Sequence, residues 1–182
     1  MEKHKIHKVP LGIYRANCYL IHNLENNRAV IIDCCDGEEL QKYFDDNGLK
    51  LDIKYGLITH GNFDHVGGVP YLFTKTKNVN MVYDGLTMDF EDFKIDVIST
   101  PGHTQGGMTY KFENHIFTGD TLFKNTIGRT DLYGGDFETL VSSIKNKLFK
   151  LPNDTIVHAG HGKDTTIGDE IKNNEFVGER EL

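Results

Sequence analysis

The ten residues "THGNFDHVGG" (59–68) contain two histidines, one aspartate, one asparagine and three glycines. Imidazole nitrogens and carboxylate oxygens are the ligands that Zn²⁺ accepts, and Fe²⁺ or Mn²⁺ accept them less selectively. Glycines beside such side chains let the backbone turn sharply and approach an ion closely. The stretch therefore predicts one part of a metal-binding site, with His60 and His65 as candidate ligands.

Further candidate ligands occur in glycine-containing segments elsewhere in the chain. The segments "TPGHT", "HIFTGD" and "HAGHG" each place a histidine or an aspartate directly after a predicted strand. For any one histidine, a solvated loop residue is an equally good interpretation. Several similar positions together favour metal ligation, and they are His60, His65, His103, Asp120 and His161.

Length and composition fit a single globular domain over residues 1–182. This length is enough to bury a hydrophobic core. The hydrophobic fraction of 38% and the charged fraction of 26% are ordinary for a soluble protein. The net charge of -7 disfavours binding to nucleic acid or to an anionic membrane surface. We therefore expect neither nucleic acid nor membrane as a partner.

The N-terminus and the cysteines predict a cytoplasmic protein. Residues 1–21 interrupt every short apolar run with charge, so we expect no signal peptide, and no stretch approaches the length of a membrane span. The three cysteines form no disulfide framework and suit a reducing compartment. For the adjacent Cys34 and Cys35, we favour two small buried side chains over a redox-active pair.

Hydrophobic patterning predicts a mixture of strands and helices. Asp64 is a good residue to begin a helix, and Glu113 and Asn114 are expected to form a hairpin turn. The predicted strands cover residues 17–22, 28–33, 55–59, 78–84, 93–100, 107–112, 115–120 and 154–159. The predicted helices cover 37–48, the segment from near 64 to 73, 137–151 and 167–172.

Seven signatures follow one another along nearly the whole chain. They are "NCYLI", "VIID", "THGNFDHVGG", "TPGHTQGGM", "FTGDTLF", "IGRTDL" and "AGHGKDTTIGDE". In this order they resemble the metallo-β-lactamase-fold superfamily, and within it the small, single-domain, glyoxalase-II-like (hydroxyacylglutathione hydrolase-like) hydrolases. The resemblance implies an α/β (α+β) fold, the αβ/βα four-layer sandwich. In that fold, two mixed β-sheets are flanked by helices, and the metals lie at one edge of the sheets.

The resemblance also implies a binuclear metal site, with zinc expected and iron or manganese as alternatives. The implied ligands are His60, residue 62 and His103 for the first ion, Asp64, His65 and His161 for the second, and Asp120 bridging both. Residue 62 departs from the family pattern H-x-H-x-D-H, because it is asparagine. An amide oxygen is a weaker donor than imidazole. We therefore expect the second site to fill first and the first to be partly occupied or empty, with Asn62 coordinating weakly or binding a metal-bound water.

Thioester hydrolysis is the activity that the resemblance implies, with Asp64 and Asp120 as catalytic residues. Two divalent ions carry more positive charge than these two carboxylates offset, which lowers the pKa of bound water from about 15.7 toward about 7. The metal-bound hydroxide would attack the thioester carbonyl. A thiol of pKa about 8.5 can then leave as thiolate without a strong general acid. The expected partner is a small-molecule thioester or ester, and the expected assembly is a monomer or weak homo-oligomer.

Two other functions remain open. One is a low-activity or non-catalytic metal-binding relative whose first site is degraded at Asn62. The other is a non-haem iron oxidoreductase of the same fold, against which the loss of a histidine at position 62 stands. The chain ends soon after His161, so we expect no C-terminal helical domain of the kind that helps the larger glyoxalase II enzymes bind glutathione. The thiol half of the substrate is therefore open.

Several other polar residues have less specific interpretations. We favour a structural role for Asp33. Arg129, in the segment "GRTD", offers either a contact for an anionic substrate or an ion pair that braces its loop. Lys163 offers a similar anion contact, but a solvated lysine is favoured. The remaining histidines are interpreted as surface or strand residues, and they are His4, His7, His22, His115 and His158.

Overall fold

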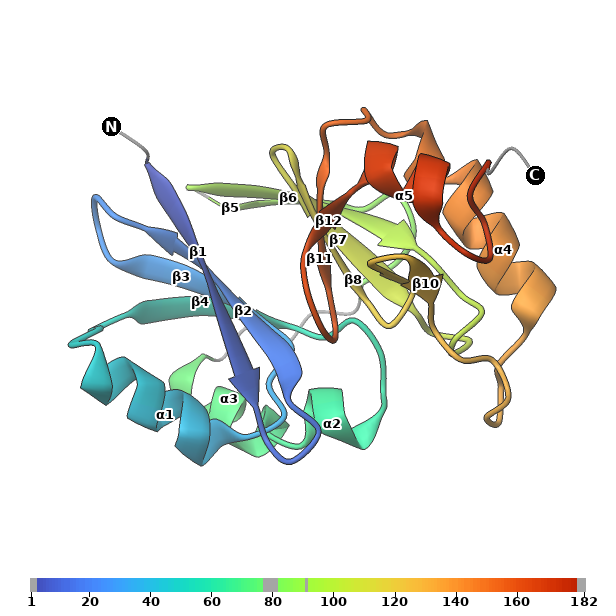
Figure 1. The fold of residues 1–182 in the computed structure, drawn as a ribbon. Helices are drawn as coiled ribbons and strands as arrows, with labels where there is room; N and C mark the ends of the chain where they lie inside the picture. Colours follow the sequence, from blue (N-terminus) through green and yellow to red (C-terminus); the bar gives the residue numbers. More distant parts are fainter. Residues whose placement is uncertain (1–2, 77–81, 91, 180–182) are drawn as a thin grey trace. The chain divides into compact units, whose positions relative to one another are not determined.

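The computed structural model describes residues 3–76, 82–90 and 92–179. The chain forms two compact units, Met1–Met81 and Val82–Leu182, called the first and the second unit below (Figure 1). Each unit has its own β-sheet and its own hydrophobic core. The prediction of a single domain over the whole chain stays a prediction.

The first unit is a four-stranded sheet with three helices. The strands are β1 (His4–Leu11), β2 (Ala16–Asn23), β3 (Arg28–Ile32) and β4 (Asp52–Leu57), in the order β1-β2-β3-β4. The pairs β1–β2 and β2–β3 are antiparallel and β3–β4 is parallel, so the sheet is mixed. The helices are α1 (Gly37–Asp46), α2 (Phe63–Val66) and α3 (Val69–Lys75). Leu40, Phe44 and Leu72 from α1 and α3 pack in the core against Leu20 and Ile31 of the sheet.

The helix expected over 37–48 is confirmed as α1, because its end signals act locally. The carboxylate of Asp36 accepts hydrogen bonds from the backbone N–H groups of Glu38 and Glu39, which satisfies donors that the first helical turn leaves unpaired. Gly48, with φ of 63°, follows the C-cap and ends the helix, since glycine adopts this conformation without a Cβ clash.

The helix expected from near Asp64 through residue 73 is two short helices instead. The N-cap of α2 is Asn62, and the helical conformation is interrupted at Gly67 and Gly68, between α2 and α3. The N–H of Gly68 donates to the carbonyl of Cys34 over 2.7 Å. A Cβ at Gly68 would lie 2.4 Å from the Cys34 sulfur, so only glycine permits this close approach to the loop after β3.

The second unit is built on a six-stranded mixed sheet with the order β12-β11-β8-β7-β6-β5. Its strands are β5 (Thr87–Phe90), β6 (Phe93–Ser99), β7 (Met108–Phe112), β8 (His115–Gly119), β11 (Ile156–Ala159) and β12 (Thr165–Thr166). Only β8 and β11 pair in parallel among these described strands. A small hairpin joins β9 (Leu122–Phe123) to β10 (Thr126–Ile127), and the helical elements are α4 (Phe137–Asn146), η1 (Leu148–Lys150) and α5 (Ile167–Asn173).

The amphipathic helix predicted over 137–151 is confirmed as α4 followed by the 3-10 turn η1. Leu140, Ile144 and Leu148 are fully buried against Ile116 of the sheet. Phe137 has the spacing of the same apolar stripe in the sequence, but it is 49% exposed at the start of the helix. Among the described residues, none of the helices combines the length and the apolar character that crossing a membrane requires.

Several strand boundaries differ from the predictions. The strand expected over 55–59 is β4, which begins at Asp52 and ends at Leu57. The strand expected over 78–84 lies mostly outside the described residues, and its described part, 82–84, is not in a strand. Strands β1 and β5 and the two-residue strands β9, β10 and β12 were not predicted. The hairpin turn at Glu113 and Asn114 is confirmed.

All three cysteines have free thiols, and two of them are buried. Cys18 and Cys34 have exposed fractions of 1% and 0%, whereas Cys35 is half-buried. Burial raises the pKa of Cys34 to about 12 and the pKa of Cys35 to about 11, with a further contribution from neighbouring acidic groups. The interpretation as small packed side chains is therefore confirmed for Cys34, and Cys35 is partly accessible.

Candidate metal centre

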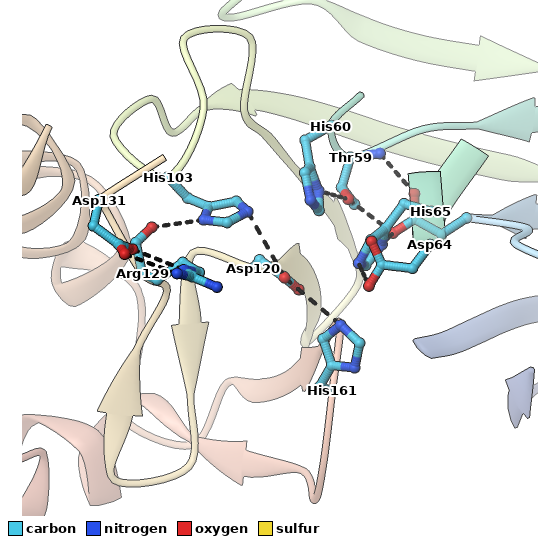
Figure 2. Close-up of polar contacts among 10 residues, drawn as sticks. Thr59, His60, Asp64, His65, His103, Asp120, Arg129, Asp131 and His161 are labelled. Carbon is cyan, nitrogen blue, oxygen red and sulfur yellow. Dashed lines mark hydrogen bonds and ion pairs between the residues drawn. The ribbon is translucent and has the colours of Figure 1, made fainter. Parts of the chain in front are cut away.

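In the first unit, three predicted ligands lie together after the end of β4. His60 and His65 are buried, and their ring centroids are 4.2 Å apart (Figure 2). Nε2 of His65 lies 3.9 Å from Oδ2 of Asp64, whose side chain is 22% exposed. The loop after β4 and the single turn of α2 therefore bring two imidazoles and one carboxylate to the same place.

A carboxylate that is not a predicted ligand fixes this arrangement. Asp33 accepts hydrogen bonds of 2.8 Å from the backbone N–H and from the hydroxyl of Thr59. Its Oδ2 also lies 2.8 Å from Nδ1 of His65. Because a carboxylate only accepts, Nδ1 of His65 carries the hydrogen, and Nε2 is the nitrogen with a lone pair for a metal. These contacts show the structural role expected for Asp33.

Thr59 also orients the His60 ring. The Thr59 hydroxyl donates to Asp33 and lies 3.0 Å from Nδ1 of His60. Its oxygen is therefore the acceptor in the contact with His60, which places the hydrogen of neutral His60 on Nδ1 and the lone pair on Nε2. Thr59 was not singled out from the sequence, and its only signal was its position directly before His60.

Asn62 occupies the N-cap position of α2. Its backbone is extended, with φ of -69° and ψ of 145°, and its carbonyl accepts hydrogen bonds from the N–H groups of His65 and Val66. Its side chain makes no capping hydrogen bond and is half-buried. The backbone of Asn62 thus starts the turn that carries Asp64 and His65, while its part in metal binding stays a prediction.

In the second unit, the other three predicted ligands also lie together. His103 follows β6, Asp120 follows β8 directly, and His161 follows β11. Oδ2 of Asp120 lies 3.8 Å from Nε2 of His103 and 3.6 Å from Nε2 of His161 (Figure 2). Two ligand atoms on one tetrahedral zinc ion are about 3.3 Å apart, so small inward shifts bring these atoms to coordination distance.

The loop carrying Gly128 and Arg129 orients His103. Nδ1 of His103 donates to the carbonyl of Arg129 over 2.7 Å, which again leaves the lone pair on Nε2. A Cβ at Gly128 would lie 1.8 Å from the carbonyl oxygen of Asp120 and 3.3 Å from Cβ of His103. Glycine is therefore required where this loop passes between two of the predicted ligands.

The Arg129 side chain forms the loop-bracing ion pair that was one of its two interpretations. Its Nε and one terminal nitrogen each donate to Asp131 over 2.7 Å, and both side chains are exposed. The hydrogen bond from Arg129 lowers the pKa of Asp131 to about 2. Lys163 is exposed in the loop after His161. The other histidines lie in strands as predicted, in β1, β2, β8 and β11.

Each unit brings together imidazole nitrogens and a carboxylate, which are groups that bind divalent metal ions. Residues 11–97 and 82–161 match the family model of the Metallo-beta-lactamase superfamily. The chain belongs to this superfamily. Its two mixed sheets and their helices match the metallo-β-lactamase α/β sandwich fold, which confirms the predicted fold class.

Relatives within the metallo-β-lactamase superfamily cover almost the entire chain. Hydroxyacylglutathione hydrolase GloC of Haemophilus influenzae is 33% identical, over 93% of this chain and 96% of that protein. The crystal structure of BLEG-1 B3 metallo-β-lactamase has a TM-score of 0.87 at 32% identity, over 95% of this chain and 99% of that one. The structure of TTHA1623 in a di-iron-bound form has a TM-score of 0.78 at 31% identity, over 93% and 99%. Membership of this superfamily implies a metallo-hydrolase that binds divalent metal.

Proposed function

We propose that this protein is a metal-dependent thioester hydrolase that resembles hydroxyacylglutathione hydrolases. The observation that carries the proposal is the position of the Asp120 carboxylate, 3.8 Å and 3.6 Å from Nε2 of His103 and His161. A carboxylate between two imidazoles suits a ligand that bridges ions. The 33% identity to the Haemophilus influenzae hydroxyacylglutathione hydrolase supports the thioester as substrate class.

The ligands proposed for the metal ions are those that membership of the superfamily implies. We assign His60, His103 and Asp120 to the first ion, and Asp64, His65, His161 and Asp120 to the second. Bound divalent ions supply Lewis acidity and lower the pKa of water that they bind. Zinc suits this nitrogen and oxygen donor set, and iron is the alternative that the di-iron-bound relative supports.

The protein's own residues orient the metal-ligating rings and the attacking water. Asp33 and the Arg129 carbonyl hold His65 and His103 so that Nε2 of each ring presents its lone pair. The Asp64 carboxylate accepts a hydrogen bond from the attacking water and so aims it at the carbonyl carbon. The leaving thiol needs no dedicated acid because its pKa of about 8.5 lets it depart as thiolate.

The asparagine at position 62 decides between full and reduced activity. With Asn62 as a weak donor, His60, His103 and Asp120 would hold the first ion, which is still a three-ligand set of the kind that catalytic zinc uses. The alternative is a metal-binding relative with little or no activity, in which only the second ion stays bound. A small-molecule substrate, a cytoplasmic location and a monomeric or weakly associating chain complete the proposal.

The test combines metal content with release of thiol. The full chain is saturated with zinc and exhaustively exchanged into metal-free buffer, and zinc per chain is measured. Hydrolysis of an S-acylglutathione is followed by thiol release, with the matching oxygen ester as comparison. We expect turnover of the thioester with between one and two zinc ions per chain, because the first site is expected to be only partly occupied, and one ion without turnover would favour the inactive relative.

Two variants show whether turnover depends on the proposed ligands. Asp120→Asn weakens the negative charge shared by both ions and is expected to lower turnover at least about 100-fold. Asp154→Asn changes an exposed carboxylate of the same unit and is the matched control. Equal turnover in Asp120→Asn and the wild type would overturn the proposal.

A further inference from the structure

Two residues outside the proposed ligand set close the loop that carries His161. Strands β11 and β12 pair antiparallel, with Val157 opposite Thr165, so the next facing positions are His158 and Asp164. Nδ1 of His158 lies 3.0 Å from Oδ2 of Asp164, across the mouth of this hairpin loop. We call this contact the His158–Asp164 clamp.

The clamp histidine is held on its other sides by the neighbouring strand β8. Because the Asp164 carboxylate only accepts, Nδ1 of neutral His158 donates to it, and Nε2 accepts from Nδ1 of His115 over 3.0 Å. The His158 ring lies nearly parallel to the rings of His115 and Phe117, with centroid distances of 5.2 Å and 4.9 Å. His158 is only 6% exposed. Its ring is therefore a fixed anchor.

The start of the same loop is attached to β8 as well. The parallel register between β11 and β8 shifts after His158, and the N–H of Gly160 then donates to the carbonyl of Gly119 over 2.7 Å. Gly119 directly precedes Asp120. The clamp and this backbone bond therefore anchor His161 from both sides to the strand end that carries Asp120.

We propose that His158 and Asp164 are positioning residues for His161, an inference that rests on the proposed function. The His161 side chain is 31% exposed, compared with 6% for His103, so packing restrains it less. The clamp fixes the backbone on which this more exposed ligand stands. It keeps Nε2 of His161 near the Asp120 carboxylate before an ion binds, which lowers the entropy lost on binding.

A zinc-binding measurement tests the proposal without using activity. The zinc affinity of the metal-free full chain is measured by competition with a chromophoric chelator. Asp164→Ala removes the acceptor, and we expect it to weaken zinc binding about 10-fold, the lower end for outer-shell partners of metal ligands. Asp164→Asn keeps an oxygen that accepts from His158 and is expected to retain most of the affinity. Asp154→Ala, which removes an exposed carboxylate before the same strand, is the control and should bind zinc like the wild type.

The same measurement in a His161→Ala chain distinguishes positioning of His161 from a general effect on the fold. In His161→Ala, the clamp has no ligand to position, so adding Asp164→Ala is expected to change zinc affinity no further. His158→Phe, which keeps an aromatic ring beside Phe117 but loses the donor to Asp164, is a second way to open the clamp. It should weaken zinc binding as Asp164→Ala does.

The outcomes distinguish failure of the clamp from failure of the proposed function. If the wild type binds zinc and hydrolyses thioester while Asp164→Ala keeps the same affinity, the clamp proposal falls and the function stands. An equal loss in the His161→Ala background, or loss of folding in both clamp variants, would show a purely structural contact and also overturn positioning. A wild type that binds no zinc would overturn both.

Discussion

The carboxylate of Asp33 lies 2.8 Å from Nδ1 of His65, and both side chains are buried. Asp33 has a φ of 55°, a left-handed conformation that aspartate tolerates better than most residues. From this position its two oxygens serve both His65 and Thr59. A single side chain directly after β3 therefore sets the orientation of the first unit's ligands.

Asp33→Asn should weaken zinc binding and lower stability. An asparagine cannot accept at both oxygen positions, and its N–H₂ group facing His65 would move the hydrogen of the ring to Nε2. We expect about 10- to 100-fold weaker zinc binding, and a free energy of unfolding lowered by about 1–3 kcal/mol. Chelator competition and urea unfolding measure the two effects. Asp46→Ala, which breaks only an exposed pair with Lys42, is the control; zinc affinity equal to that of the control would contradict the assigned role.

Asn62→His should strengthen the first metal site. An imidazole is a stronger donor than an amide, so we expect zinc content after exhaustive exchange to rise toward two ions per chain if the wild type retains about one. Metal analysis of both proteins gives the answer. Asn62→Ala is the paired variant, because it loses zinc only if the native amide contributes to binding. No gain of zinc in Asn62→His would argue that position 62 does not face the ion.

Stability should fall as the pH falls from about 6.5 to about 4. Burial, with the charge of Lys5 and a contribution from His22, lowers the pKa of His7 from 6.5 to about 4. The unfolded chain binds a proton in this window and the folded chain does not, so stability is fully present above it and declines within it. We expect His7 to account for about 1–2 kcal/mol after solvent screening. Urea unfolding at several pH values should show a shallower decline in His7→Gln than in the wild type.

The control for this pH dependence is His4→Gln, on the same strand β1. It should keep the wild-type decline between pH 6.5 and pH 4, because the shifted group is His7. A His7→Gln chain with the same decline as the wild type would mean that another group titrates in this window.

Gly128→Ala should disturb two metal ligands at once. The added Cβ would lie 1.8 Å from the carbonyl oxygen of Asp120 and 3.3 Å from Cβ of His103, so the backbone must move. We expect a loss of about 1–3 kcal/mol in unfolding free energy together with weaker zinc binding. Gly106→Ala is the matched control, because its Cβ would meet no atom within 4 Å. Calorimetric unfolding and zinc titration of the two variants should differ clearly, and equal behaviour would refute the close approach.

Elements with local signals agree with the sequence-based predictions, whereas elements set by tertiary contacts do not. The apolar stripe of α4 and the apolar face that Leu40 and Phe44 form on α1 are patterns within a few residues, so the sequence predicts both helices. Strand β1 was not predicted because His7 takes an inward position that the pattern assigns to apolar residues. The break between α2 and α3 depends on the approach of Gly68 to Cys34, which the local sequence does not contain.

The candidate site also has a part that the sequence predicts and a part that it does not. Ligand types and their glycine neighbours are visible in the sequence, and within each unit the structure brings the predicted ligands together. The partners that orient them come from distant positions. Asp33 lies 26 residues before Thr59, and the carbonyl that holds His103 belongs to Arg129, also 26 residues away. A backbone carbonyl carries no sequence signal, so this second set of contacts could be found only in three dimensions.

The raised pKa values of Cys34 and Cys35 have a consequence for an enzyme whose proposed product is itself a thiol. A thiol exchanges with disulfides only as thiolate, and the raised pKa values keep Cys34 and Cys35 almost entirely protonated at neutral pH. We therefore expect this chain to resist mixed-disulfide formation with the oxidised form of its own product. In a colorimetric assay of thiol release, the folded protein should also contribute little background colour.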